Sequence, residues 1–183
     1  MSSSDLQLSR GEPVSDTAKV ASSMLDVIAL RVDKHETLDM FAANSSVPVI
    51  NALSDLSHPC QILADLMTFK ENSESELEKV CWIGDGNNVC NSYIEASKIL
   101  DFELSIYCPK EYSPDPSFLN YAKQNSSFAN SREEAAKGAD IITTDVWVSM
   151  GDEKTKERAF EGYFVDTDLI ENTGKKSIFL HCL

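Results

Sequence analysis

Residues 79–109 read KVCWIGDGNNVCNSYIEASKILDFELSIYCP, and this stretch decides the fold. The apolar run KVCWI predicts a buried strand, the polar turn GDGNN follows it, and NNVCNSYIEASKILD has the periodicity of a helix. A second apolar run, ELSIYC, comes next. The order strand, helix, strand, with strands that are apolar throughout, is typical of a parallel sheet covered by helices on both faces.

The same alternation extends in both directions along the chain. The polar segment SESELE, residues 73–78, predicts a hinge between two halves, and residues 27–32 fit either the end of a helix or a short strand. We therefore expect an α/β protein with two doubly wound parallel sheets. The other predicted strands are 47–53, 140–147 and 177–183, and the other predicted helices are 15–31, 35–45, 60–72, 115–124, 131–139 and 165–173.

Composition excludes several classes of protein. The chain has 183 residues and a formal net charge of −14, so nucleic acid and anionic membranes are unfavourable partners. No apolar stretch reaches the roughly 18 residues of a membrane span, and the N-terminus does not have the pattern of a secretory signal. Five scattered cysteines predict a reducing, cytoplasmic location, and three histidines without ligand spacing predict no metal site.

In parallel sheets ligands bind beyond the carboxyl ends of the strands, which here are followed by residues 85–88, 109–110, 145–147 and 181–183. The turn IGDGNN is similar to a dinucleotide-binding turn, but Val89 stands where a third glycine belongs, and no carboxylate ends the next strand. We therefore expect no cofactor, although a nicotinamide-dependent oxidoreductase stays an alternative that NADH fluorescence would test. The turn instead offers two amides at a helix N-terminus, where a small carboxylate can bind.

Two further segments carry candidate site residues. LSHPCQ, residues 56–61, places His58 and Gln61 where a loop enters a helix, so that both can point at one small polar group. Taken alone, such a histidine is more often structural. Asp145 ends a strand and precedes the charged segment 152–162, which fits either a lid or a solvated surface loop.

Taken together, HPCQ at 58–61, DGNN at 85–88, DVWVSMG at 145–151 and HCL at 181–183 resemble the ornithine carbamoyltransferase family over essentially the whole chain. HPCQ is common to transcarbamoylases, whereas SMG is the mark of the ornithine enzymes. The resemblance implies transfer of the carbamoyl group of carbamoyl phosphate to the side-chain amine of L-ornithine, giving citrulline and phosphate. It also implies the transcarbamoylase fold, with an incomplete carbamoyl phosphate-binding domain at 1–70 and an ornithine-binding domain at 71–183 that lacks its C-terminal end.

On the carbamoyl phosphate side, the resemblance assigns the carbamoyl group to His58 and Gln61, with positive charge from Arg31. Gln7 resembles a residue that the family lends to a neighbouring subunit, which implies a homo-oligomer, typically a trimer. On the ornithine side, Cys182 is expected beside the reacting amine, and the backbone carbonyl of Leu183 is the other neighbour. Either a Cys182 thiolate or the carbonyl would accept a hydrogen bond and orient the amine. Arg31, His58, Asp145 and Cys182 are thus the implied catalytic residues. The implied ornithine-binding residues are Asn88, Asp145, Ser149, Met150, Cys182 and Leu183.

Two family motifs do not occur in these 183 residues: Ser-x-Arg-Thr-Arg, which binds phosphate, and Pro-x-x-Arg-Gly-x-Glu, which follows HCL. We therefore expect a chain truncated at both ends. Since each charge-assisted hydrogen bond to phosphate contributes about 1.5–3 kcal/mol, we also expect this chain alone to make no citrulline above background. A transcarbamoylase for another amine and a non-catalytic amino-acid-binding remnant stay open, and competing substrates and ornithine calorimetry would separate them.

Overall fold

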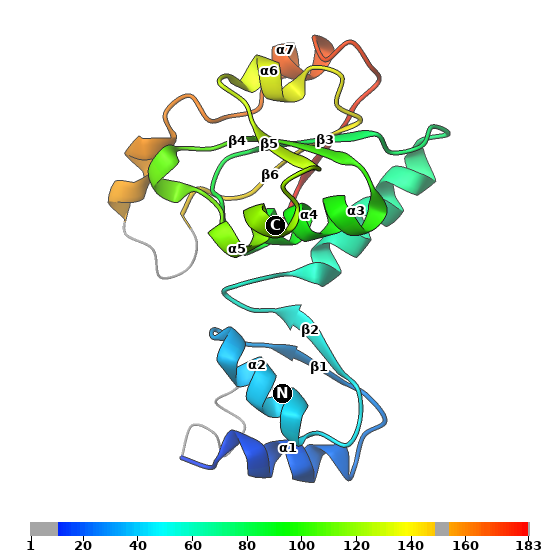
Figure 1. Ribbon diagram of the computed structural model, residues 1–183, viewed down its shortest axis with the longest axis vertical. Helices are drawn as coiled ribbons and strands as arrows, with labels where there is room; N and C mark the ends of the chain where they lie inside the picture. Colours follow the sequence, from blue (N-terminus) through cyan, green and yellow to red (C-terminus); the bar gives the residue numbers. More distant parts are fainter. Residues whose placement is uncertain (1–10, 149–153, 183) are drawn as a thin grey trace. The chain divides into compact units, whose positions relative to one another are not determined.

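The structure is a computed structural model, and it describes residues 11–148 and 154–182. The chain divides into two compact units, Met1–Cys60 and Gln61–Leu183. This division falls near the start of helix α3 (Pro59–Asn72). The domain boundary that the resemblance implied, after residue 70, lies near the other end of this helix. We describe the two units separately (Figure 1).

The described part of the first unit is a small parallel sheet with two helices. Strands β1 and β2 pair in parallel, and Ala18, Ile28 and Phe41 form the buried core. The segment 27–32, which fitted either a helix or a strand, is therefore a strand. The first helix ends at Ser22 rather than at residue 31, since the hydroxyls of Ser22 and Ser23 bond back to helix carbonyls there. In chain order the elements are α1 (Val14–Ser22), β1 (Ile28–Arg31), α2 (His35–Asn44) and β2 (Val49–Leu53).

The second unit is built on a five-stranded parallel sheet with the order β5-β4-β3-β6-β7. The chain moves outward from β3 through β4 to β5 and then returns to the other side of β3 with β6 and β7. The strand order therefore reverses between β3 and β6. After α3, the elements are β3 (Lys79–Ile83), α4 (Asn88–Leu100), β4 (Glu103–Tyr107), η2 (Lys110–Tyr112), α5 (Pro116–Tyr121), β5 (Ser126–Phe128), α6 (Arg132–Ala136), β6 (Ile141–Thr144), η3 (Lys154–Phe160), α7 (Thr167–Glu171) and β7 (Ile178–His181).

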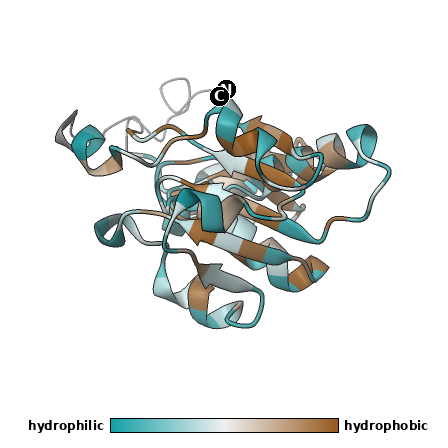
Figure 2. Cartoon of the chain, turned by 90° about the horizontal axis from the view of Figure 1, so that it is seen from above, coloured by the Kyte–Doolittle hydropathy of each residue, from teal (hydrophilic) through white to brown (hydrophobic). Residues whose placement is uncertain are grey.

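Helices cover both faces of this sheet, as the continuous apolar strands predicted. Val80 and Trp82 of β3 pack toward α3 and α4, whereas Cys81 and Ile83 pack toward α6 and α7. Figure 1 shows α3, α4 and α5 on one side of the sheet and α6 and α7 on the other. The strand residues between these helices are mostly hydrophobic, and Figure 2 shows hydrophobic colouring along the strands. The α/β class with doubly wound parallel strands is therefore confirmed for this unit.

Two elements differ from the sequence-based expectation. Strand β5 was not predicted, because its three residues, two of them serines, form a partly exposed edge next to β4. The segment 152–162 contains the 3-10 helix η3, whose last residue, Phe160, is fully buried between Trp147, Tyr112 and Tyr163. A solvated loop is therefore the wrong description of the end of that segment. Across residues 11–148 and 154–182, no helix combines the length and apolarity that crossing a membrane requires.

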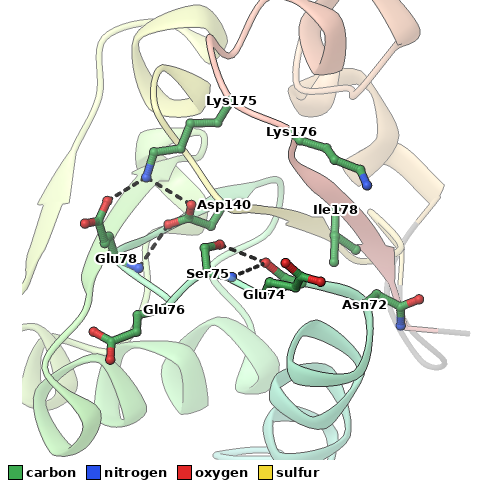
Figure 3. Close-up of a pocket in the computed structure, with 10 residues that line it drawn as sticks. Asn72, Glu74, Ser75, Glu76, Glu78, Asp140, Lys175, Lys176 and Ile178 are labelled. Carbon is green, nitrogen blue, oxygen red and sulfur yellow. Dashed lines mark hydrogen bonds and ion pairs between the residues drawn. The ribbon is translucent and has the colours of Figure 1, made fainter.

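The amino ends of β3, β6 and β7 surround a polar hollow of about 600 Å³ (Figure 3). Asp140 is buried there and accepts hydrogen bonds from the main-chain nitrogens of Glu78 and Lys79, each at 2.9 Å. Lys175 Nζ lies 3.0 Å from Asp140 Oδ1 and 2.7 Å from Glu78 Oε2. This buried carboxylate therefore joins the segments that enter β3 and β7, and it stabilises the edge of the sheet opposite to the strands' carboxyl ends.

Candidate functional site

The candidate site lies where the carboxyl ends of β3 and β6 are neighbours. Open parallel sheets bind ligands at this position, because the chain leaves the two strands toward opposite faces and opens a crevice. The Thr144 hydroxyl donates to the Ile83 carbonyl at 2.6 Å, and it is buried. This bond holds the ends of the two strands together, so that the residues after them, 84–88 and 145–148, start from fixed positions.

The backbone of the turn after β3 packs closely against the backbone of residues 112–114. The Gly86 nitrogen donates to the Tyr112 carbonyl at 2.9 Å, and a Cβ on Gly86 would collide with the backbone at Tyr112 and Pro114. Gly84 has a φ of +133°, a conformation that favours glycine. The two glycines of IGDGNN are therefore explained by the packing of this turn, without a pyrophosphate to accommodate.

Asn87 joins the two strand ends through its side chain. Its Oδ1 caps helix α4 by accepting from the main-chain nitrogens of Val89 and Cys90, at 3.0 and 3.2 Å. Its Nδ2 donates to Asp145 Oδ2 at 2.6 Å. Asp145 Oδ1 accepts from the Val146 nitrogen at 2.7 Å. The carboxylate is thus fixed on both oxygens. The sequence pattern had grouped Asn87 with Asn88 as a ligand for a small carboxylate, but Asn87 instead positions Asp145.

Cys182 follows β7 and lies beside the same carboxylate. Burial raises the pKa of its thiol well above the usual range, and the hydrogen bond to Asp145 and the charges of Asp145 and Asp65 raise it further. The sulfur is therefore a neutral thiol at physiological pH, which disfavours the thiolate alternative. Burial and the charge of Asp65 likewise raise the pKa of the Tyr93 hydroxyl, and the nearby Cys182 raises it further. Asp145, Cys182, Asp65 and Tyr93 thus form one electrostatic cluster in the second unit.

This environment of Cys182 makes a testable prediction about its reactivity. Since only the thiolate reacts, alkylation of an ordinary thiol levels off near about pH 9, whereas alkylation of Cys182 should still rise roughly tenfold per pH unit there. Asp145→Asn should lower the pKa of the thiol and therefore speed its alkylation at about pH 8. The measurement is iodoacetamide labelling followed by mass spectrometry of the peptide that contains Cys182, with free glutathione as the reference. A plateau at or below the glutathione value would contradict the assignment.

The residues expected to hold the carbamoyl group follow the strands of the first unit or begin helix α3. Arg31 ends β1, pairs with Leu53 in the register of β2, and has an exposed side chain that forms no ion pair with another described residue. His58 lies in the loop between β2 and α3 and is half-buried. Gln61 is the third residue of α3, and its Nε2 donates to Asp65 Oδ1 at 2.9 Å.

Asn88 is the first residue of α4, and its Oδ1 accepts from the Val89 nitrogen at 3.0 Å. His181 is exposed, and its Nδ1 lies 2.7 Å from the Cys182 carbonyl, so the ring must donate there. In the described ranges, no three His, Cys, Asp or Glu side chains are grouped as metal ligands would be. The remaining predicted site residues, Gln7, Ser149, Met150 and Leu183, lie outside the described residues.

Sequence reasoning missed an ion pair at the same edge of the sheet. The Lys156 ammonium of η3 contacts the Asp85 carboxylate, and the two side chains are only 12% and 9% exposed. The same ammonium lies 5.0 Å from the centre of the Tyr112 ring, within the range of a cation–π interaction. This buried pair anchors η3 to the end of β3. The sequence gives no signal for it, because the partners are separated by most of the second unit.

Comparison with known families gives matches over both parts of the chain. Residues 77–183 match the family model for the Asp/Orn-binding domain of aspartate/ornithine carbamoyltransferase. Residues 1–71 match the model for the carbamoyl-P-binding domain of the same family. The ranges leave residues 72–76 unmatched, and this gap overlaps the segment 73–78 for which a hinge was predicted.

Individual relatives and solved structures agree with these matches. The ornithine carbamoyltransferase of Campylobacter jejuni (strain RM1221) is 48% identical over all of this chain and 64% of its own length, and that of Halorhodospira halophila is 47% identical over all of this chain and 62% of its own.

Among solved structures, the anabolic ornithine carbamoyltransferase of Campylobacter jejuni superposes with a TM-score of 0.91 at 44% identity, covering 99% of this chain and 64% of its own. The Thermus thermophilus enzyme superposes with a TM-score of 0.88 at 39% identity, covering 100% of this chain and 62% of its own. The chain thus spans less than two thirds of the length of these relatives. The family models cover nearly every residue, and the fold matches that of the solved structures, so the chain belongs to the aspartate/ornithine carbamoyltransferase family.

Proposed function

We propose that this chain is part of an ornithine carbamoyltransferase, which transfers the carbamoyl group of carbamoyl phosphate to the side-chain amine of L-ornithine. The observation that carries the proposal is the Asp145 carboxylate, fixed at the reversal of the strand order by Asn87 and flanked by the Cys182 thiol. A fixed anion beside a neutral thiol suits an amino acid that carries two amines, one to be bound as a cation and one to react.

The reaction requires little from the protein except binding and orientation. The lone pair of the unprotonated ornithine amine attacks the carbamoyl carbon, forming a C–N bond and a tetrahedral oxyanion. The C–O bond to the phosphate then breaks with its electron pair, and the amine proton leaves with the phosphate as hydrogen phosphate. Citrulline is the other product. Catalysis therefore depends on donors for the oxyanion, cations for the phosphate and an aimed amine.

We assign these tasks as the family resemblance implied. His58 and Gln61 bind the carbamoyl group, and Arg31 supplies positive charge. Asp145 and Ser149 bind the α-ammonium of ornithine, with the main chain of Met150 beside them, and Asn88 binds the α-carboxylate. Cys182 contacts the reacting amine through its sulfur lone pairs, and the Leu183 carbonyl is the second acceptor. A neutral thiol suits this task because it accepts a hydrogen bond from the amine and adds no charge that would favour the ammonium.

Gln7 implies that the complete enzyme is an oligomer, and we propose a trimer in which Gln7 serves a neighbouring subunit. Analytical ultracentrifugation of the complete protein, together with an activity assay, would test this proposal. A fully active monomer would show that Gln7 does not serve a neighbouring subunit. A cytoplasmic location is proposed from the five scattered cysteines, which form no disulfide in the structure.

The decisive experiment uses a chimera, in which residues 1–183 replace the matching stretch of the Campylobacter jejuni ornithine carbamoyltransferase. The chimera should form citrulline from carbamoyl phosphate and ornithine. It should prefer ornithine over putrescine, aspartate and N-acetylornithine by about 100-fold or more in kcat/KM, because those amines lack one of the groups that Asp145 and Asn88 bind or carry a different charge.

A second variant is the chimera with Cys182→Ala, which removes the contact to the reacting amine and leaves Asn88 and Asp145 in place. It should retain ornithine binding and lose roughly 10–100-fold in kcat. A chimera that is stable and trimeric but uses another amine better than ornithine would refute the proposed substrate. Calorimetry that detects ornithine binding without turnover would favour the non-catalytic alternative.

A further inference from the structure

The glutamine expected to bind the carbamoyl group is held by a buried carboxylate one helical turn away. Asp65 of α3 is only 7% exposed. Its Oδ1 accepts from Gln61 Nε2 at 2.9 Å, and its Oδ2 accepts from the Tyr93 hydroxyl of α4 at 2.6 Å. The two residues are four positions apart on one helix face, so that their side chains meet naturally. Asp65 had no role in the sequence-based assignment.

This contact decides which end of the Gln61 amide is presented to a ligand. A carboxylate can only accept hydrogen bonds, so the atom of Gln61 nearest Asp65 must be the amide nitrogen. The amide oxygen is therefore at the other end, where it can accept but not donate. Tyr93 in turn fixes the Asp65 carboxylate, because its hydroxyl occupies the second oxygen. The side chains of Gln61, Asp65 and Tyr93 thus form one oriented chain of hydrogen bonds.

An amide oxygen distinguishes carbamoyl phosphate from its closest analogue. The carbamoyl group carries an NH₂ that donates hydrogen bonds, whereas acetyl phosphate carries a methyl group of similar size in the same place. A methyl group facing the Gln61 oxygen would leave that oxygen without a hydrogen-bond partner, which costs binding free energy. If the Gln61 amide were free to turn, its NH₂ end could face the ligand instead, and the NH₂ of carbamoyl phosphate would lose its acceptor.

We propose that Asp65 is a positioning residue that sets the specificity for a carbamoyl over an acetyl group, by fixing the amide oxygen of Gln61 toward the transferred group. The proposal rests on the proposed function and deepens it. Asp65 itself does not touch the substrate. Its effect must therefore pass through Gln61, and this separates a positioning role from a general loss of structure.

The experiment measures carbamoyl-versus-acetyl selectivity in the chimera, as kcat/KM for carbamoyl phosphate multiplied by the inhibition constant of acetyl phosphate. Asp65→Leu is combined with Tyr93→Phe, since replacing both partners of a buried hydrogen bond by apolar groups of similar shape is nearly neutral for stability. Compared with Tyr93→Phe alone, the double variant should lose selectivity about 10–100-fold. Asp65→Asn keeps an acceptor oxygen for Gln61 and should lose less than about threefold.

The background of Gln61→Ala provides the control for the pathway of the effect. In this background we compare the variant that carries both Asp65→Leu and Tyr93→Phe with the variant that carries Tyr93→Phe alone. Their selectivities should differ by less than about twofold, because an effect that passes through Gln61 disappears when Gln61 is absent. Unchanged selectivity in the double variant, an equal loss in Asp65→Asn, or full additivity with Gln61→Ala would each overturn the proposal.

A measurement on the unsubstituted 183-residue chain keeps the inference testable if the variants fail to fold. The side-chain amide protons of Gln61, assigned by NMR through Gln61→Ala, should exchange with water at least about tenfold more slowly than those of the exposed Gln124. Equal exchange rates would overturn the proposal. If the chimera forms no citrulline, the proposed function fails, and the exchange rates still decide whether Asp65 holds Gln61.

Discussion

Asp145→Asn in the chimera is expected to lower kcat/KM for ornithine roughly 300-fold, or about 3.4 kcal/mol, mainly through a higher KM. Asparagine has the shape of aspartate but only one acceptor oxygen, so it keeps the contact to Asn87 Nδ2 or the contact to the Val146 nitrogen, which use different oxygens of Asp145. What is lost is the negative charge that binds the α-ammonium of ornithine. Steady-state kinetics with varied ornithine at saturating carbamoyl phosphate would measure the effect.

Asp168→Asn is the matched control, because this carboxylate is exposed on α7 and lies away from the carboxyl ends of β3 and β6. It should change kcat/KM by less than about twofold. KM for carbamoyl phosphate should stay within about threefold in Asp145→Asn, since that substrate does not contact Asp145 in the proposed site. An Asp145→Asn enzyme with a normal KM for ornithine would show that another group binds the α-ammonium.

Asp85→Asn is expected to destabilise the second unit by about 3–5 kcal/mol, the usual cost of removing one partner of a buried ion pair. The Lys156 ammonium, only 12% exposed, would lose the charge of Asp85 while it stays near the Tyr112 ring. Urea unfolding of the 183-residue chain, followed by the fluorescence of its two tryptophans, would measure the free energy of unfolding.

Two further variants test the cause of this loss. Asp85→Asn combined with Lys156→Met removes the charge that Asp85 balances, so it should restore at least about half of the lost free energy. Glu103→Gln breaks the more exposed pair with Lys79, whose atoms are 3.2 Å apart, and should cost less than about 1 kcal/mol. Equal costs for Asp85→Asn and Glu103→Gln would mean that the buried pair contributes no more than a surface contact.

Much of the fold was predictable because burial leaves a pattern in the sequence. The strands at Lys79–Ile83, Glu103–Tyr107 and Ile141–Thr144 are largely buried on both faces, and each lies within a predicted strand. Ser126–Phe128 was missed because a short edge strand needs only one buried neighbour and can therefore contain serines. Ile28–Arg31 was ambiguous because four residues are too few to distinguish the periods of a strand and a helix.

The sequence suggested residues for the candidate site but not the groups that contact them. The resemblance assigned roles to Asp145, Cys182 and Gln61, and the structure adds the side chains that hold them in place. Asn87 and Asn88 are the same amino acid in adjacent positions, so no pattern could reveal that Asn87 turns to cap a helix and bind Asp145. Asp65 stands between apolar residues of a helix, where the sequence suggests an exposed position rather than a buried one.

The strand order also determines when the site can form during folding. The pairing of β3 with β4 joins residues 24 positions apart, whereas the pairing of β3 with β6 joins residues about 61 positions apart. Closing the longer loop costs more chain entropy, so the contacts within β3–α4–β4 are favoured to come first. Asn87 would then cap α4 before Asp145 arrives from a position 58 residues further along the chain. Helical structure should therefore return before ornithine binding when the protein refolds. In a folding intermediate, Asn87 would already cap α4, and its hydrogen bond to Asp145 would not yet have formed.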